Sequence, residues 1–573
     1  MRFYLPILAA ALLIAGCGKP ADPVVKELKA PQNVVLHGST ETSLTFQWAV
    51  VEDATGYDWR LTSDGEDTRE GSTTSRNVTV SKLKPGTAYG FSVRATRTGV
   101  QSEYSSVLSV TTQGTAPQPG GPRVKVDAPL VLDFESQPVL GTSGLIKLFN
   151  SSGTEVDRID LADLATVTTR DDGCTVPAAQ MLDNSKFTTF MDALPCSGKW
   201  RMVHCTPLRI EGKSLVIRPH SGILKFDTEY YVTVDQGVVQ GFAGTGPGEW
   251  KFTTASAPAS DTELRVASDG SGDFCTIQAA LDYASASGCT VSVAPGTYAE
   301  LLFLRDKAGI TLKGDSRDGV KIVYPNCETY QNGSGGSVGS RPSFGSSIGK
   351  NGGRSVLLVE NCDRLTIESL TLENSFGGLK GQAETIYFNS GSNAHRLTVE
   401  NCTLLSYQDT FLCKGEVWVH GSLIAGHCDF IWGYPKVCLF EDCEIRARSA
   451  GYIVQARVPA ASDKGFVFLN CRLTAEGSVK SGTMYLARSA GQADCFDNVT
   501  FVGCTMSDAI APAGWYSSPA PNPSKPTATA GWKEYGSVGT GGSPATGSRN
   551  ALGRILNADE AAAFSSRAAV LGW

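Results

Sequence analysis

The sequence has little that would suit nucleic acid, a metal ion or a membrane-spanning segment. Its formal net charge is only −7 over 573 residues, and no basic patch is interleaved with aromatic residues, so nucleic acid is not an expected partner. The six histidines show no paired metal-ligand spacing, and we expect no metal and no cofactor. One apolar run, Phe3 to Ala15, is too short to span a bilayer, and no second run follows it.

This apolar run has the pattern of an export signal. Arg2 precedes it, and small residues lead directly to a cysteine in Leu13-Ile14-Ala15-Gly16-Cys17. Residues 1–17 resemble the signal peptide of bacterial lipoproteins, in which cleavage leaves the cysteine to be acylated. The resemblance implies lipid attachment at Cys17 and, because no Asp follows, an exported protein anchored to the bacterial outer membrane, on the cell surface or the periplasmic face. The alternative is an ordinary signal peptide in which Cys17 is accidental.

Length and composition predict several β-rich domains. The chain of 573 residues is longer than the roughly 250–300 residues that one hydrophobic core supports. Apolar residues make up 41% and charged residues 19%, and 62 residues are glycine, which is typical of a β-rich globular chain rather than a disordered or helical one. We therefore predict an all-β protein.

The first folded segment has the alternation of a β-sandwich. Residues 18–29 have the composition of a short charged linker, and residues 30–113 then alternate apolar and polar side chains in short runs. Trp48 lies in the first of these runs, and a Pro85-Gly86 turn precedes Tyr89. The pattern resembles a fibronectin type III domain. It contains no catalytic grouping, so we expect it to space or dock another domain.

A second strand-rich segment follows a Pro- and Gly-rich hinge. The hinge covers residues 114–122 and the segment covers residues 123–256. Its last strands resemble those of bacterial Ig-like domains, which are also β-sandwiches. Cys174, Cys196 and Cys205 are an odd number of thiols for an oxidising compartment. We expect one disulfide and one spare thiol among them.

From about residue 262 a different repeat begins, in which short apolar strands end in a polar residue followed by cysteine. The instances are Val359-Glu360-Asn361-Cys362, Val399-Glu400-Asn401-Cys402, Phe440-Glu441-Asp442-Cys443, Phe468-Leu469-Asn470-Cys471 and Phe501-Val502-Gly503-Cys504. Gaps of 40, 41, 28 and 33 residues with a fixed phase predict a right-handed parallel β-helix whose loops vary in length. We expect the cysteines to stack as small buried apolar groups without disulfides, and the Asn amides to satisfy turn backbone.

Two carboxylates in apolar, strand-like settings are the strongest sign of chemistry. Asp409 lies in Tyr407-Gln408-Asp409-Thr410, and Asp429 lies twenty residues later in the stretch from Gly426 to Gly433. An amide, Gln408, directly precedes the first of them. Paired acids with a neighbouring amide are the groups that general acid–base or nucleophilic catalysis requires.

With other landmarks in the same order, this region resembles the pectin methylesterase family over residues 262–573. The further landmarks are Val266-Ala267-Ser268-Asp269-Gly270-Ser271-Gly272-Asp273-Phe274-Cys275-Thr276-Ile277-Gln278-Ala279-Ala280-Leu281, Gly296-Thr297-Tyr298-Ala299-Glu300, Gln382-Ala383, Asp429-Phe430-Ile431, Gly514-Trp515 and Glu534-Tyr535. The resemblance implies a β-helix that hydrolyses carboxylic esters without a metal.

The resemblance also implies a role for each matched residue. Asp429 would attack the ester carbonyl as the nucleophile and form an acyl-enzyme. Asp409 would protonate the departing methanol and later take a proton from water, for which a nearby carboxylate must raise its pKa. Gln382 and Gln408 would donate to the developing oxyanion, and Arg488 would pair with Asp429.

The chain departs from the family after Arg488. Ser489-Ala490 follow it where the family has Pro-Trp, so the flat apolar wall for the sugar is missing from its usual position. We expect Trp432, Trp515 and Phe411 to bind substrate in its place.

The hypothesis favoured by these residues is a monomeric pectinesterase that removes methyl esters from pectin and releases methanol. One alternative is a lipoprotein relative that hydrolyses another ester or an acyl thioester, which the missing Pro-Trp and the lipid anchor favour. The other is a carbohydrate-binding solenoid without catalysis, against which the presence of both aspartates counts.

Overall fold

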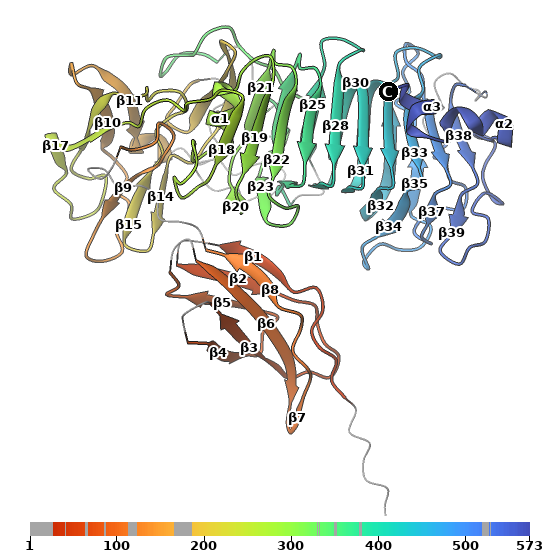
Figure 1. Cartoon of the computed structure of the whole chain (residues 1–573), viewed down its shortest axis with the longest axis horizontal. Coiled ribbons are helices and arrows are strands. Elements are labelled where there is room, and N and C mark those ends of the chain that lie inside the picture. Colours follow the sequence, from red (N-terminus) through yellow and green to blue (C-terminus); the bar gives the residue numbers. More distant parts are fainter. Residues whose placement is uncertain are drawn as a thin grey trace, which may run out of the picture. The chain divides into compact units, whose positions relative to one another are not determined.

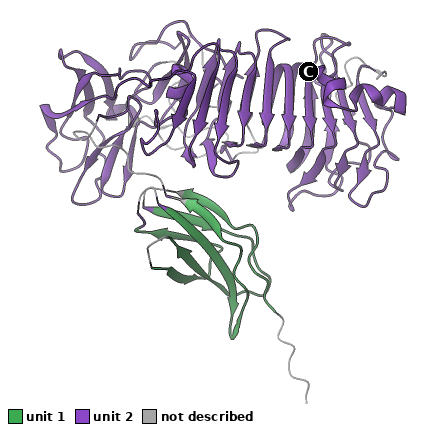
Figure 2. Ribbon diagram, in the orientation of Figure 1, with its two compact units in different colours: residues 1–38, 43–82, 88–110 green, residues 39–42, 83–87, 111–573 purple. Residues whose placement is uncertain are grey.

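The computed structural model describes most of the chain beyond its N-terminal segment. The described residues are 27–39, 42–63, 67–84, 87–112, 123–165, 186–328, 330–331, 333–348, 352–377, 381–517, 527 and 529–573. They form two compact units, one built mainly from residues 43–82 and 88–110 and the other containing residues 111–573 (Figure 2). The predicted signal peptide with Cys17, the hinge and Cys174 lie outside the described residues.

The first unit is the predicted fibronectin type III sandwich. Its strands are β1 (Val35–Ser39), β2 (Ser43–Gln47), β3 (Gly56–Thr62), β4 (Arg69–Thr73), β5 (Asn77–Ser81), β6 (Ala88–Arg97), β7 (Val100–Gln101) and β8 (Leu108–Thr111). One sheet has the order β1-β2-β5 and the other β4-β3-β6-β7, with β8 beside β6 (Figure 1). Between them, Phe46 stacks on Phe91 with ring centroids 3.7 Å apart.

The second unit begins with three small antiparallel sheets. Their strands are β9 (Leu130–Asp133), β10 (Leu145–Asn150), β11 (Glu155–Asp160), β12 (Met191–Cys196), β13 (Lys199–His204), β14 (Leu208–Glu211), β15 (Ser214–Ile217), β16 (Glu229–Val234) and β17 (Thr245–Thr253), with a 3-10 helix, η1 (Leu161–Ala165). The sheets β11-β10-β16-β17 and β14-β15-β9 share one apolar core. This segment is β-rich as predicted, and its assignment as an Ig-like domain stays a prediction.

The β12–β13 hairpin packs on the rest of the second unit rather than on these two sheets. Leu194, Cys196 and Val203 belong to the long apolar core that continues through the C-terminal strands. Cys196 and Cys205 are both free thiols, so the expected disulfide is wrong for this pair. The reason is that Cys196 lies in that long core, whereas the Cys205 thiol faces the backbone carbonyl of Thr189.

The C-terminal region is a parallel β-helix, as predicted. Its strands are β18 (Glu263–Val266), β19 (Cys289–Val293), β20 (Gly296–Tyr298), β21 (Leu302–Arg305), β22 (Ile310–Gly314), β23 (Val320–Tyr324), β24 (Leu357–Glu360), β25 (Leu365–Glu368), β26 (Thr371–Asn374), β27 (Ile386–Asn389), β28 (Arg396–Glu400), β29 (Thr403–Leu405), β30 (Phe411–His420), β31 (Leu423–Glu441), β32 (Glu444–Ala456), β33 (Gly465–Leu469), β34 (Arg472–Ala475), β35 (Met484–Ala487), β36 (Val499–Val502), β37 (Thr505–Met506), β38 (Trp532–Tyr535), β39 (Val538–Gly539) and β40 (Gly553–Ile555). Most strands pair in parallel with the strand one coil further on, so that each coil buries its inward side chains against the next (Figure 1).

Four of the repeated polar-Cys pairs, those ending in Cys402, Cys443, Cys471 and Cys504, form one corner of the coils. The prediction of a shared corner is wrong for Cys362, because it follows β24, which pairs with β27 and not with β28. The cysteines are at most 1% exposed, and their thiols donate to backbone carbonyls, which confirms that they are small buried groups. The residues before them, Asn361, Asn401, Asp442, Asn470 and Gly503, all have φ between 51° and 61°. Asn, Asp and Gly adopt this left-handed conformation most readily. The expected role of the amides was wrong at Asn361 and Asn401, which donate to the side chains of Asp306 and Ser369 on the preceding coil.

Short helices cover parts of the β-helix. Helix α1 (Ile277–Tyr283) is capped at its N-terminus by Thr276, whose side chain accepts a hydrogen bond from the backbone N–H of Ala279. Helices α2 (Ala558–Ala561), η3 (Ala562–Phe564) and α3 (Arg567–Leu571) contribute apolar side chains to a cluster with β31, β33 and β36. Within the described residues, no helix has the length and apolar character needed to cross a membrane.

Candidate active site

Three carboxylates lie at the same level on neighbouring coils. Ile386 pairs with Phe411, and Phe411 pairs with Ile431. Two residues before these positions are Glu384, Asp409 and Asp429, which are 0%, 3% and 4% exposed. Because paired strands are about 4.8 Å apart, the three acids form a column in which Asp409 is the middle member. We call these three residues the carboxylate column.

Asp429 accepts hydrogen bonds from two side chains, Arg488 and Gln455. The Nε of Arg488 donates to its two carboxylate oxygens at 2.8 and 3.0 Å, and a second guanidinium nitrogen also contacts Oδ2. Gln455 donates to the same oxygen at 2.8 Å. The Gln455 carbonyl accepts from Arg457 at 2.6 and 3.0 Å, which fixes the direction of the amide. The predicted pairing of Arg488 with Asp429 is therefore present.

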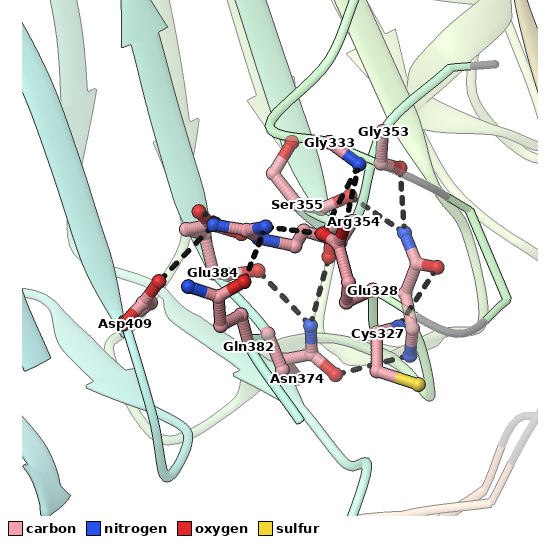
Figure 3. A network of polar contacts seen from close by, with 12 residues as sticks. Cys327, Glu328, Gly333, Gly353, Arg354, Ser355, Asn374, Gln382, Glu384 and Asp409 are labelled. Atoms are coloured by element: carbon pink, nitrogen blue, oxygen red, sulfur yellow. Dashed lines mark hydrogen bonds and ion pairs between the residues drawn. The ribbon is translucent and has the colours of Figure 1, made fainter. Parts of the chain in front are cut away.

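Asp409 is held from the other side of the column by Arg354. The guanidinium donates to Oδ2 of Asp409 at 3.1 Å and to both oxygens of Glu384 at 3.0 and 3.1 Å (Figure 3). It also contacts Glu328 and donates to the Gln382 carbonyl at 2.8 Å. Arg354 therefore binds Glu384 with two hydrogen bonds and Asp409 with one.

The charges of the column determine which acid holds a proton. Burial raises the pKa of Asp409 well above its ordinary value, Glu384 adds to the rise, and Arg354 opposes it. Asp429 raises the pKa as well, but less than Glu384 does. The expected effect of a neighbouring carboxylate is thus present, with Glu384 rather than Asp429 as the larger source. The middle acid is the one suited to donate a proton.

Two half-buried amides lie beside the column. Gln382 and Gln408 form a parallel bridge on adjacent coils, one residue before Ala383 and Asp409. Because Arg354 donates to the Gln382 carbonyl, the NH₂ group of that amide turns away from the guanidinium (Figure 3). Such an N–H group can donate to an oxygen that gains negative charge.

Both catalytic candidates have unusual backbone. The φ angles of Asp409 and Asp429 are 65° and 47°, in the left-handed region that few residues other than glycine enter. Asp tolerates this region better than most residues, and such angles are common at functional sites. The backbone therefore turns at each acid.

Two of the aromatic residues expected to bind substrate do not reach the site. Phe411 is 0% exposed and packs edge-on against Phe440 inside the coils, with ring centroids 6.1 Å apart. Trp515 is 1% exposed and stacks on Trp532 at 5.5 Å. Those predictions were wrong because both rings point into the apolar core, where no sugar can enter.

Trp432 lies at the site but supports its arginines. The ring is 7% exposed, and the guanidinium carbons of Arg457 and Arg354 lie 4.8 and 5.9 Å from its centroid. Beside Arg488 lies a cluster of half-buried tyrosines. Tyr516 lies 4.7 Å from Tyr452 and 5.1 Å from Tyr485 between ring centroids, and Arg488 lies over Tyr452 at 5.1 Å. We call Tyr452, Tyr485 and Tyr516 the tyrosine cluster.

Sequence reasoning missed Arg354, Glu384, Gln455 and Arg457. The signal that could have found Glu384 is a lone acid between Ala383 and an apolar strand, where a charge is costly unless paired. Arg354 follows two glycines and lies three residues before Leu357, the first residue of another buried strand. Pairing the two required knowing which coils are neighbours.

The other clusters of the unit do not add to this site. No group of three or more His, Cys, Asp or Glu side chains is arranged to hold a metal in the part of the chain that the structure describes. A cavity of about 440 Å³ lies among β13, α1 and the segment before β16, and its lining includes His204, His220 and Glu300. The carboxylate column does not line it.

Comparison of the chain with known proteins finds two matching family models and several relatives. The family model described as Pectinesterase matches residues 263–572, and the one described as Fibronectin type III domain matches residues 29–111. Pectinesterase 31 of Arabidopsis thaliana is 31% identical over 260 residues, which cover 44% of this chain and 76% of that protein. A pectinesterase of Aspergillus niger is 27% identical over 312 residues, covering 52% and 86%. A solved pectin methylesterase from Yersinia enterocolitica aligns at 24% identity with a TM-score of 0.42, covering 52% of this chain and 99% of that one.

Proposed function

Because the chain belongs to the pectinesterase family, we propose that it is a carboxylic ester hydrolase that removes methyl esters from pectin. The products are methanol and polygalacturonate. The observation that carries the proposal is the carboxylate column, in which Arg488 holds Asp429 as an acceptor and the pKa of Asp409 is raised. One acid is then ready to attack while its neighbour carries a proton.

In the first half of the reaction, an oxygen of Asp429 attacks the carbonyl carbon of the ester. The carbonyl oxygen becomes an oxyanion, to which the amides of Gln382 and Gln408 donate. When this intermediate collapses, the bond to the methoxy oxygen breaks and Asp409 gives its proton to that oxygen. Methanol leaves, and an anhydride joins Asp429 to the sugar acid.

In the second half, water replaces methanol. Asp409, now a carboxylate, takes a proton from the water as its oxygen attacks the anhydride. The bond to Asp429 breaks, which releases Asp429 as a carboxylate and the sugar as a carboxylic acid that loses its proton to the solvent, and both acids return to their starting states. One water is consumed for each ester, and Asp409 acts first as acid and then as base.

The tyrosine cluster takes the place of the missing tryptophan wall. Its rings are half-buried, and that of Tyr452 lies against Arg488, which pairs with the attacking acid. Aromatic faces of this kind stack on the apolar side of sugar rings while their hydroxyl groups stay hydrated. Substrate binding is therefore assigned to tyrosines rather than to Trp515 or Phe411.

The direct test is methanol release from highly methylated pectin by the full chain purified in detergent. We expect methanol and an equal amount of new carboxylate, because hydrolysis of each methyl ester gives one of each. A folded protein that releases neither would contradict pectin as substrate. Hydrolysis of acyl thioesters or other esters in parallel assays would then favour the alternative relative, and binding without turnover would favour a carbohydrate-binding solenoid.

Changing Glu384 to glutamine should shift the pH dependence of kcat/KM. Asp409 must hold a proton to act as acid, so activity is lost as the pH rises through its pKa. Glu384 raises the pKa of Asp409 and Arg354 lowers it. A neutral glutamine at position 384 removes the rise but keeps the effect of Arg354, so the pKa of Asp409 should fall. We expect the alkaline limb of the profile to move to lower pH.

The pH-dependent rates should be measured with Glu368→Gln as control. Glu368 lies in β25 and pairs with Lys313 at 2.9 Å, away from the carboxylate column. Its replacement should leave the profile unchanged. An alkaline limb that stays in place in Glu384→Gln would contradict the assignment of Glu384 as the charge that keeps Asp409 protonated.

We propose further that the protein is exported and anchored by a lipid on Cys17 to the bacterial outer membrane, and that it is a monomer. The support is the sequence of residues 1–17. Changing Cys17 to alanine should abolish labelling by radioactive palmitate and move the protein from the membrane fraction to the soluble fraction. Retention of Cys17→Ala in washed membranes would contradict the lipid anchor, and sedimentation of the released protein would give its oligomeric state.

A further inference from the structure

The β12–β13 hairpin places a buried arginine against the β-helix. Arg201 in β13 is 0% exposed, so its charge needs hydrogen-bond acceptors on every side. Its Nε donates to the carbonyl of Gly352 at 2.8 Å, and Nη1 donates to those of Leu302 and Val356 at 2.6 and 3.1 Å. Nη2 donates to the carbonyls of Gly353 and Ser355 at 3.1 and 2.5 Å. Five backbone carbonyls therefore converge on one side chain.

Four of these carbonyls belong to the segment 352–356, on both sides of Arg354. The hairpin backbone adds a further contact, because Gly352 donates to the carbonyl of Met202 at 3.0 Å. A Cβ atom at Gly352 would lie 2.0 Å from that carbonyl oxygen, so the two segments are as close as glycine allows. The hairpin therefore holds the backbone on both sides of Arg354. The side-chain amide of Asn326 also donates to the carbonyls of Gly353 and Ser355, that of Asn374 donates to the carbonyl of Arg354, and the segment has further backbone hydrogen bonds to neighbouring strands.

The side chain of Arg354 is in turn fixed by contacts on several sides. Its side chain is 5% exposed, and its nitrogens contact Glu384, Asp409, Gln382 and Glu328. Moving it would change two reacting groups together, because one guanidinium orients the Asp409 carboxyl and turns the Gln382 amide. A displacement of about 1 Å at such a contact is enough to reduce a rate strongly.

We propose that the β12–β13 hairpin is a working part of the active site: Arg201 fixes segment 352–356 so that Arg354 orients Asp409 and Gln382. Both arginines are positioning residues, since neither needs to touch the ester. This inference rests on the proposed esterase function and extends it to a segment that precedes the β-helix. It predicts that the hairpin affects turnover as well as stability.

The test is a double-mutant cycle with Arg201→Met and Arg354→Met, measured as kcat and KM for methylated pectin. We expect Arg354→Met to lower kcat by roughly 10²-fold, similar to the loss of one oxyanion donor. Arg201→Met should lower kcat by about tenfold with little change in KM, because it acts through the position of Arg354. In the double variant the two losses should not multiply, and kcat should equal that of Arg354→Met alone.

Lys307→Met is the matched control for Arg201. Lys307 is 5% exposed, and its ammonium donates to the backbone carbonyls of Leu281, Asp282 and Ala284 at 2.5–2.8 Å. It is therefore another buried cation that holds backbone, but it does so near α1 instead of near Arg354. Its loss should lower Tm while kcat, measured well below Tm, stays unchanged.

Several outcomes would overturn the inference. If Arg201→Met lost stability like Lys307→Met but kept the wild-type kcat, coupling through Arg354 would be contradicted. The same holds if the two arginine losses multiplied in the double variant. A crystal structure of Arg201→Met gives a readout independent of turnover, in which Arg354 is expected to lose its contacts with Asp409 and Gln382. Unchanged contacts would contradict the inference, whereas a wild-type protein inactive on pectin would contradict only the proposed function.

Discussion

Replacing Asp429 with asparagine is expected to lower kcat for methanol release by about 10⁴-fold or more, the usual scale for losing a nucleophile. The amide oxygen cannot form the anhydride, so the first covalent step is lost. Folding should be retained, because asparagine tolerates the φ of 47° at this position and still accepts hydrogen bonds from Arg488. Methanol release and Tm should be measured on the same samples.

Asp442→Asn is a suitable control for Asp429→Asn. Asp442 also has a left-handed backbone, with a φ of 53°, and it follows a strand of the same β-helix. Its side chain is 57% exposed and takes no part in the carboxylate column. Both variants should have a Tm close to that of the wild type, and only Asp429→Asn should be inactive. Substantial turnover by Asp429→Asn would rule out covalent catalysis by this residue.

The second large effect is expected at Asp409. Asparagine has no proton to give to the departing methoxide, and it cannot take one from water, so kcat should fall by roughly 10²–10⁴-fold. The loss should depend on the leaving group, because trifluoroethanol is a much stronger acid than methanol and leaves without protonation more easily. The measurement is the rate on pectin esterified with methyl groups against pectin esterified with trifluoroethyl groups.

Comparison of the two substrates separates the roles of the two acids. Asp409→Asn should recover part of its first-step rate on the trifluoroethyl ester, seen as a burst of alcohol before the slow hydrolysis of the anhydride. Asp429→Asn should be equally inactive on both esters. If Asp409→Asn showed the same loss on both esters and no burst, Asp409 would not be the general acid.

The sequence was sufficient for the β-helix and for two pairs of neighbours in its site. Cys402, Cys443, Cys471 and Cys504 recur at one corner after one or two coils, and the burial of these thiols follows from that fixed phase. Arg488 contacts Asp429, and Gln382 lies beside Gln408. Both pairings were expected because the motifs that contain these residues occur in the same order as in the family. These features are local in sequence or carried by motifs, which is why they could be predicted.

The remainder of the site depends on which coils are adjacent and which way a side chain points. Arg354 and Glu384 are 30 residues apart, and only their places on neighbouring coils bring the guanidinium to the carboxylate. Trp515 and Phe411 are aromatic residues of the kind that stack on sugars. In the structure, however, both side chains point into the core and are buried. The partner of segment 352–356 is Arg201, more than 150 residues away, and no local pattern could indicate it.

The strand pairing of the β-helix has a consequence for how such a site can change. Glu384, Asp409 and Asp429 come from successive coils, so the spacing of their backbones is set by the ladder repeat that backbone hydrogen bonds impose. The repeat cannot be stretched by a single substitution, and the distance between acid and nucleophile is inherited from the fold. Loops between the coils are free of that constraint. Diversification toward new polysaccharides would therefore proceed by exchange of loops around a catalytic spacing that stays constant.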